Sequence, residues 1–370
     1  MTKAALNQNE LRALRKLTGE PEVISSSSIQ SSTIMSSSTC EAVSSMPVPD
    51  APDNGVLVKI THAGACYLEG QTRNRRYTPQ FPGNEVAGTI HEVGNNLPNA
   101  NFTVGDRVMV MPDEDSINTG YAEYVPVDDV SRVLQIPNKV PLEVAAMLPG
   151  DALKAYAAVN CAAPHVEKLR KVKSTVNILV IGGSSLGLWS VKLAKYMMGR
   201  NCNNVRLFVA DNSIDRLLTA QDHGCHDIIH WNEEDHEQYI VERTLDSCRG
   251  GVDVIIDYVG TNRTMQRCLK VLNREGLILV GGNKPCETSI SLSTLAAKQQ
   301  SIVGVPRGNI NQLIELLNAV EGKQVEIPAY KVFPVEDANH IFEEICECRI
   351  TERAVFRFGS QSSGHLVDNH

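Results

Sequence analysis

The stretch NILVIGGSSLGLWSVKLAK, residues 177–195, decides the fold of this chain. An apolar run leads directly into a glycine-rich loop, residues 182–187, and an amphipathic helical pattern follows the loop. In a G-x-G-x-x-G spacing the first glycine permits a tight turn and the last permits close packing of helix on strand, while free N–H groups at the helix start bind phosphate. Ser184 stands at the middle glycine position, where it adds only a small side chain. The candidate cofactor-binding residues of the loop are Gly182, Gly183, Ser184, Ser185, Leu186 and Gly187.

A second signal for a dinucleotide lies where the next apolar run, residues 206–210, ends at Asp211. An acid at the carboxyl end of the second strand accepts hydrogen bonds from the ribose hydroxyls and repels a 2′-phosphate. We therefore expect NAD(H) to be the preferred cofactor. NADP(H) is the alternative, because Arg216 follows closely and can attract a 2′-phosphate. A plain strand-to-helix turn in which Asp211 caps the next helix is the competing interpretation.

Outside this unit the chain shows two different patterns of apolar residues. From about residue 141 it alternates short apolar runs with amphipathic helical patterns, which predicts an α/β fold with a doubly wound parallel sheet. Before residue 141 it shows short strand patterns separated by Gly, Pro and Asn, which predict a β-rich domain. The expected strands are 56–60, 85–93, 104–111, 121–127, 177–181, 206–210, 252–257, 277–280 and 354–358, and the expected helices are 187–198, 214–223 and 309–320.

The composition is that of a globular protein and argues against two kinds of partner. With 370 residues, of which 42% are hydrophobic and 21% charged, the chain is long enough for two domains. Its formal net charge of −8 argues against nucleic acid and anionic membrane surfaces, since both attract concentrated Lys and Arg. No apolar run approaches the ~20 residues of a membrane-spanning helix. The ten cysteines include no C-x-x-C pair, so we expect a reducing compartment.

Residues 1–39 have the composition of a disordered tail, because their runs of Ser and Thr carry no periodic apolar face. Arg12, Arg15 and Lys16 precede the Ser-rich runs, a combination that is also typical of mitochondrial transit peptides. A cytoplasmic location is our prediction, and mitochondrial import is the alternative.

Several segments occur in an order that resembles one enzyme superfamily. The most specific pair is PGNEVAGTIHEVG, residues 82–94, followed by VGDRV, residues 104–108; the segments AAMLPGDALKAYAAV, residues 145–159, GVDVIIDYVG, residues 251–260, and ERAVFRF, residues 352–358, come later. From about residue 44 to residue 358 the chain resembles the medium-chain dehydrogenase/reductase superfamily, which includes alcohol dehydrogenase-like and quinone oxidoreductase-like members. The resemblance implies a tail over 1–39, a β-rich GroES-like catalytic domain over 40–155 that is completed by 303–358, a Rossmann domain over 156–302 and a tail over 359–370.

The chain departs from the superfamily at the catalytic zinc. Zinc-dependent members use a Cys, a His and a second Cys or Glu as ligands, and the matching positions here are Cys66, Asn84 and Gly150. One thiolate among three positions cannot hold zinc tightly, and Asp151 would complete only an unusual ligand set. The cysteine-rich structural zinc lobe of many alcohol dehydrogenases has no counterpart either. We therefore predict a zinc-lacking member of the superfamily.

The resemblance also bears on three charged residues. Glu69 and Glu85 occupy positions that are acidic in the family, and we interpret them as buried carboxylates paired with a basic residue such as Arg353. Arg353 lies where the family often places an arginine that approaches the cofactor phosphates, so it is a candidate cofactor-binding residue. An arginine on the surface is the other interpretation.

Hydride transfer without a metal needs a side chain that polarises the acceptor. Tyr67 follows a loop that borders the substrate cleft in the family, and its phenol can donate a hydrogen bond. Lys154 lies where a family threonine meets the nicotinamide; it can polarise a carbonyl or pair with Asp151. Asn84 can donate through its amide. These three residues are the candidate catalytic groups, and the alternative roles are cleft wall, ion-pair partner and core amide.

The predicted function is a zinc-independent NAD(P)H-dependent oxidoreductase that reduces an activated carbonyl, enone or quinone, because electron-poor acceptors take hydride without a Lewis acid. One alternative is a catalytically weak cofactor-binding protein that acts as a regulatory or partner-binding module. Another is a zinc alcohol dehydrogenase with atypical ligands. The expected partners are a small-molecule substrate and a second copy of the chain in a homodimer, without nucleic acid or membrane.

Overall fold

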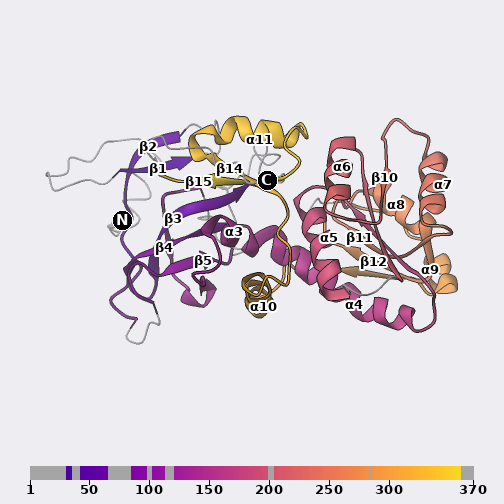
Figure 1. The fold of residues 1–370 in the computed structure, drawn as a ribbon, viewed down its shortest axis with the longest axis horizontal. Helices are drawn as coiled ribbons and strands as arrows, with labels where there is room; N and C mark the ends of the chain where they lie inside the picture. The colour runs from indigo at the N-terminus through magenta and orange to yellow at the C-terminus, as the bar shows by residue number, and fades with distance from the viewer. Residues whose placement is uncertain are drawn as a thin grey trace, which may run out of the picture.

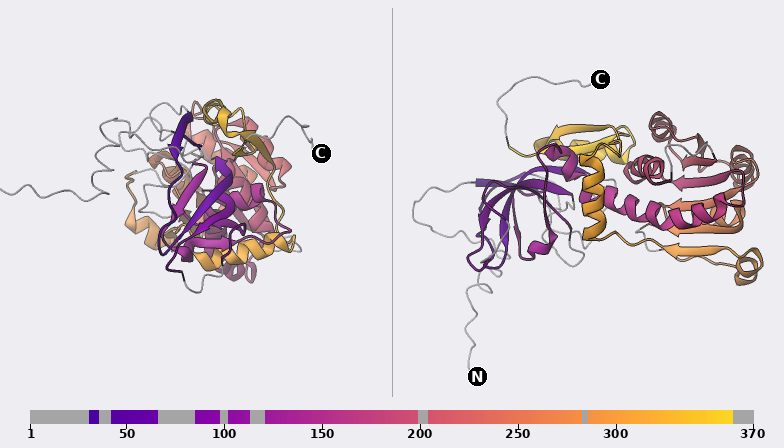
Figure 2. Two further views of the ribbon diagram at one scale, coloured as in Figure 1. Left: turned by 90° about the vertical axis from the view of Figure 1, so that its left-hand side faces the viewer. Right: turned by 60° about the horizontal axis from the view of Figure 1, so that its bottom comes forward.

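Two sheet-centred halves make up the part of the chain that the structure describes (Figure 1). The structure is a computed structural model, and it describes residues 31–35, 42–65, 85–97, 102–112, 121–198, 204–282 and 286–359. One half contains a seven-stranded sheet, and the other contains a six-stranded parallel sheet between helices. The long helix α4, Leu153–Arg170, runs from the first half into the second (Figure 2).

The six-stranded sheet has the strand order β10-β9-β8-β11-β12-β13, and every pairing in it is parallel. Its strands are β8 (Val176–Ile181), β9 (Val205–Asp211), β10 (Asp227–His230), β11 (Val252–Asp257), β12 (Leu272–Val280) and β13 (Ser301–Gly304). The chain moves outward from β8 in one direction through β9 and then in the other through β11, so the order reverses at β8. Ligands of such sheets bind beyond the carboxyl ends of the strands at this reversal. The predicted doubly wound sheet is confirmed.

Both faces of this sheet are buried, because successive side chains of a strand point to opposite faces. Val180 and Val209 pack into the core that includes residues of α4, α5 and α6, whereas Leu179 and Phe208 pack into the core that includes residues of α7 and α8. These helices are α5 (Ser185–Met198), α6 (Ile214–Asp222), α7 (Glu237–Ser247) and α8 (Asn262–Val271). Continuous apolar strands are therefore what this architecture requires.

The seven-stranded sheet is completed by the end of the chain. Its order is β14-β15-β3-β4-β5-β7, and β6 pairs with β3. The strands are β3 (Val56–Ala65), β4 (Val86–Val93), β5 (Arg107–Val110), β6 (Tyr124–Val127), β7 (Val133–Gln135), β14 (Tyr330–Pro334) and β15 (Arg353–Arg357). Ile341 and Phe342 of α11 (Ala338–Cys346) belong to the core that these strands share. The predicted β-rich domain is present, with the C-terminal strand beside β3.

Three features differ from the expectations or bear on them. Within the N-terminal segment expected to be disordered, β1 (Ser31–Met35) instead pairs antiparallel with β2 (Ala42–Pro47), so the backbone of these residues is ordered by hydrogen bonds between the two strands. Helix α10 (Ile310–Glu321) packs against α4, and β13 ends the parallel sheet at Gly304, so chain beyond residue 302 also contacts the Rossmann half.

No helix among the described residues is long and apolar enough to cross a membrane.

Candidate dinucleotide-binding site

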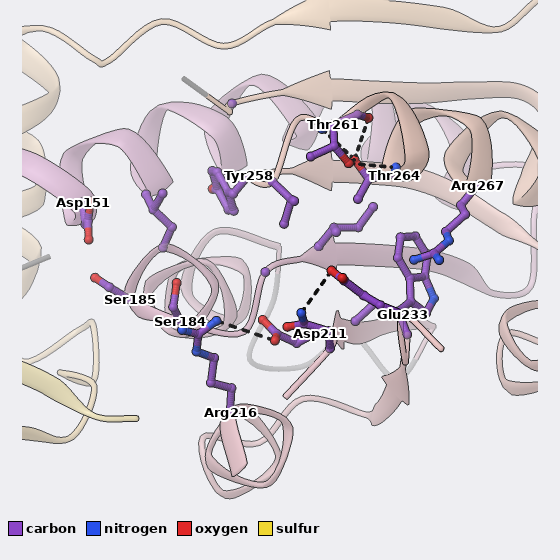
Figure 3. A pocket seen from close by; sticks show the side chains of 18 of the residues that line it. Asp151, Ser184, Ser185, Asp211, Arg216, Glu233, Tyr258, Thr261, Thr264 and Arg267 are labelled. Atoms are coloured by element: carbon purple, nitrogen blue, oxygen red, sulfur yellow. Dashed lines mark hydrogen bonds and ion pairs between the residues drawn. The ribbon is translucent and has the colours of Figure 1, made fainter. Parts of the chain in front are cut away.

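A cavity of about 260 Å³ opens at the carboxyl ends of β8, β9 and β11, where the strand order reverses. Figure 3 shows Asp151 and Ser185 toward one end and Glu233 and Arg267 toward the other, with Asp211 between them. Of the loop residues predicted to bind a cofactor, those that line the cavity are Gly182, Ser184, Ser185 and Leu186.

The glycine-rich loop turns sharply from β8 into α5. Gly182 has a φ of +103°, which a side chain rarely tolerates, and its N–H donates to the carbonyl of Ala210 over 2.9 Å. A Cβ on Gly187 would lie 2.1 Å from the Gly182 carbonyl oxygen, so helix and strand end approach too closely for any side chain there. The first and last glycines of the motif thus have the roles that the spacing predicted.

Helix α5 presents polar groups to the cavity at its first turn. The carbonyl of Ser184 accepts the N–H of Leu188 over 2.9 Å, so the helix begins at Ser185 and its first N–H groups have no helical acceptor. The hydroxyl of Ser185 is buried and has no hydrogen-bond partner among the described residues. Buried polar groups are normally satisfied, and an anion at the helix start would accept from both the hydroxyl and the N–H groups.

Asp211 ends β9 and holds the loop from the other side. It is 7% exposed, and its carboxylate accepts the N–H of Gly183 over 2.6 Å and the N–H of Ser213 over 2.9 Å. Arg216 on α6 lies 3.8 Å away and also lines the cavity. The carboxylate therefore both fixes the glycine-rich loop and faces the cavity. Asp211 does not cap α6; Ser213 does, through its own hydroxyl.

The turn after β11 forms the opposite wall. Asp257 is fully buried and accepts the N–H groups of Val259 and Gly260, over 2.9 and 3.0 Å. Burial raises the pKa of its carboxyl, and these hydrogen bonds oppose that rise. The adjacent Tyr258 donates its hydroxyl to Ser190, 2.7 Å away, since the Ser190 hydroxyl itself donates to the Leu186 carbonyl. Tyr258 therefore contributes a fixed ring rather than a free proton donor.

At the far end of the cavity, Arg267 is held against two side chains. It makes a two-pronged ion pair with Glu237, in which both contacts are 2.8 Å, and its guanidinium lies 5.2 Å from the Trp231 ring centroid. The hydrogen bond from Arg267 is the main reason that the pKa of Glu237 falls to about 2. Only 4% of the Arg267 side chain is exposed, and the carboxylate of Glu237 balances its positive charge.

The candidate catalytic residues divide into one that the structure places and two that it does not describe. Lys154, in the first turn of α4, lines the cavity and is 8% exposed. Asp151 lines the same cavity one turn earlier in the π-helical turn η2 (Leu148–Ala152). Tyr67 and Asn84 lie outside the described residues, as do Cys66 and Glu69.

Arg353 corrects one prediction and confirms another. It is not among the residues that line the cavity, nor is it on the surface: it is 1% exposed and forms an ion pair with Glu85. It also donates to Asp151 over 3.3 Å and to the Ala65 carbonyl over 3.0 Å. The β15–β3 pairing carries it into the interior of the half built on the seven-stranded sheet. The predicted buried pairing of Glu85 with Arg353 is confirmed.

Two glycines make room for this buried carboxylate. A Cβ on Gly64 would lie 2.0 Å from Glu85 Oε2, and a Cβ on Gly150 would lie 2.4 Å from Glu85 Oε1. Glu85 is 3% exposed and also accepts the N–H of Asp151 over 2.6 Å. The space beside Gly150 is therefore filled by Glu85.

Sequence reasoning missed several residues of the cavity wall. They are Asn212, Trp231, Glu233, Tyr258, Thr261, Thr264 and Arg267. Tyr258 follows a strand that was predicted correctly, so the rule that ligands bind at carboxyl ends would have identified it. Glu233 and Trp231 follow the short strand β10, which the apolar pattern did not reveal.

Both halves of the chain match families of known proteins. The family described as alcohol dehydrogenase GroES-like domain matches residues 52–138, and the family described as zinc-binding dehydrogenase matches residues 185–322. An NAD-dependent alcohol dehydrogenase of Sulfolobus acidocaldarius is 25% identical over 350 residues, covering 84% of this chain and 94% of that protein. The quinone oxidoreductase of Homo sapiens is 28% identical over 271 residues, covering 71% of this chain and 74% of that protein.

Solved structures agree on the fold. The alcohol dehydrogenase of the archaeon Aeropyrum pernix superposes with a TM-score of 0.73 at 20% identity, covering 89% of this chain and all of that one. The matched families, the similar sequences and the shared fold point to one assignment. The chain belongs to the medium-chain dehydrogenase/reductase superfamily and is an oxidoreductase with a GroES-like domain and a Rossmann domain.

Proposed function

We propose that this protein transfers hydride from NADH to an activated carbonyl, enone or quinone, without zinc. The observation that carries the proposal is the cavity at the sheet reversal, where a glycine-rich loop and Asp211 face the same space. The buried hydroxyl of Ser185 has no hydrogen-bond partner among the described residues, and the first N–H groups of α5 have no acceptor within the helix. Both kinds of donor fit a pyrophosphate. The residues present thus fit a dinucleotide, which supplies the hydride when it is bound.

In this proposal the chain's own residues bind the cofactor and orient the acceptor. The start of α5 binds the pyrophosphate, and Asp211 binds the ribose hydroxyls. Lys154 lines the cavity one helical turn after Asp151 and supplies a cationic N–H donor to the acceptor oxygen. A buried ammonium stabilises negative charge that develops on that oxygen far better than an exposed one, because little water screens it.

An NADH-oxidation screen across quinones, enones and aldehydes tests the activity. We expect turnover with at least one of these classes. Lys154→Met should lower kcat/KM by about a hundredfold, with a smaller change in NADH affinity. Lys168→Met is the matched control, because Lys168 lies on the same helix with 68% of its side chain exposed. Tight NADH binding without turnover of any acceptor would favour the catalytically weak binding protein instead.

The zinc of the superfamily does not fit the one ligand position that the structure describes. A side chain at Gly150 would collide with Glu85, and Asp151 accepts from Arg353 rather than standing ready for a metal. Elemental analysis should therefore find less than one zinc per chain, and chelators should leave the activity unchanged. One or more tightly held zinc ions per chain would contradict the proposal and favour atypical ligands.

The preference for NADH is tested at Asp211. Asp211→Asn keeps the shape but removes the charge, so NADH affinity should fall by about ten- to a hundredfold. NADPH should become less disfavoured relative to NADH, because Arg216 loses its carboxylate partner. Asp215→Asn is the control, since Asp215 is exposed in the first turn of α6, the helix that carries Arg216. Titration of both cofactors decides; NADPH binding as tight as NADH in the wild type would overturn the preference.

A further inference from the structure

A second carboxylate stands beside Asp211 at the ribose end of the cavity. Glu233 lies in the turn between β10 and α7 and lines the cavity. Asn212, the residue after Asp211, donates its amide N–H to Glu233 Oε1 over 3.2 Å. A dashed line in Figure 3 marks this hydrogen bond to Glu233. Asp211 ends β9, and Glu233 follows the neighbouring strand β10. This hydrogen bond therefore ties the Glu233 carboxylate, which lines the cavity, to the residue after Asp211.

The arginines that line this end of the cavity already have carboxylate partners. Arg216 lies 3.8 Å from Asp211, and Arg267 is paired with Glu237 and lies against Trp231. A 2′-phosphate at the ribose would therefore lie near the carboxylates of Asp211 and Glu233. The two arginines there would attract it weakly, because carboxylates already balance most of their charge. A ribose 2′-hydroxyl carries no charge and can donate a hydrogen bond to a carboxylate instead.

We propose that Glu233 is a second determinant of cofactor choice, which together with Asp211 excludes the 2′-phosphate of NADP(H). The proposal rests on the function proposed above and deepens it. Asp211 acts at short range and also shapes the loop, whereas Glu233 acts through its charge. Because Glu233 is exposed to solvent, its repulsion of a dianionic phosphate is partly screened and is smaller than that of Asp211.

The experiment measures dissociation constants of NADH and NADPH for the full chain and five variants. In Glu233→Gln the amide oxygen still accepts from Asn212, so the loop keeps its anchor while the charge is lost. The ratio of the NADPH constant to the NADH constant should fall by about three- to tenfold. Glu233→Lys should lower the ratio further. Glu234→Gln is the matched control, because Glu234 is equally exposed but does not line the cavity, and its ratio should stay at the wild-type value.

Salt separates a charge effect from a change of shape. The screening length falls from about 10 Å at 0.1 M salt to about 3 Å at 1 M salt. The amount by which Glu233→Gln lowers the ratio of dissociation constants should therefore be smaller in high salt. Asp211→Asn combined with Glu233→Gln should lower the ratio more than either substitution alone. The role of Glu233 is overturned if Glu233→Gln leaves the ratio unchanged, or if it lowers the ratio equally at low and high salt. Either result leaves the proposed function intact. Failure of the wild type to bind either cofactor overturns both.

Discussion

Gly187→Val is expected to weaken NADH and NADPH together by roughly a hundredfold, because hydrogen bonds to a charged group contribute about 1.5–3 kcal/mol and the substitution displaces those of the helix start. The added Cβ would lie 2.1 Å from the Gly182 carbonyl oxygen, so α5 must move away from the end of β8. That movement displaces the N–H groups and the Ser185 hydroxyl that face the pyrophosphate position. Overpacking should also cost about 1–3 kcal/mol of folding stability.

Gly304→Val is the control for this substitution, since a Cβ on Gly304 would meet nothing within 4 Å. Isothermal titration with both cofactors, together with thermal unfolding, measures the effect. Because the pyrophosphate is common to the two cofactors, their losses should agree. A variant that loses NADH but keeps NADPH would show that the helix start does not bind the phosphates.

Glu85→Ala is expected to destabilise the fold by about 3–5 kcal/mol, the usual consequence of removing one member of a buried ion pair. Arg353 is 1% exposed and loses its contact with Glu85, whereas its contact with Asp151, at 3.3 Å, is unaffected by the substitution. The N–H of Asp151 also loses its acceptor. Denaturant unfolding of the apo protein measures the change without any contribution from cofactor.

Two further variants make this expectation specific. Glu92→Ala removes an exposed carboxylate from β4, the strand that Glu85 precedes, and should leave stability within about 0.5 kcal/mol. Adding Arg353→Met to Glu85→Ala should recover part of the loss, because both charges of the buried pair are then removed together. A double variant as unstable as the sum of both single variants would show that the two side chains do not act as a pair.

The parallel sheet was predictable wherever strands were apolar and followed by a helix. Val252–Asp257 was predicted to the residue, since buried parallel strands read as continuous apolar runs. β10 was missed because only Ile228 and Ile229 mark it between Asp227 and His230. Its existence depends on pairing with β9 rather than on its own sequence. β14 was missed for the same reason: its alternation is weak, and β15 supplies its hydrogen bonds.

The site was predictable where a local motif defines it and not where distant residues meet. The glycine-rich loop and Asp211 followed from spacing alone, and both line the cavity or hold its wall. Arg353 could not be placed from sequence, because its direction depends on how β15 lies against β3. The importance of Glu233 depends on a loop conformation and on Asn212, which no spacing rule captures.

The position of β15 has a consequence for how the chain folds as it is synthesised. Residues His62–Ala65 of β3 pair with Ala354–Arg357, although most of the chain separates them. The parallel sheet, by contrast, contains only strands made between Val176 and Gly304. On the ribosome, the Rossmann half therefore has all of its strands before the N-terminal half does. Until the last strand emerges, that end of β3 remains an open edge, the kind of surface that invites mispairing and engages chaperones.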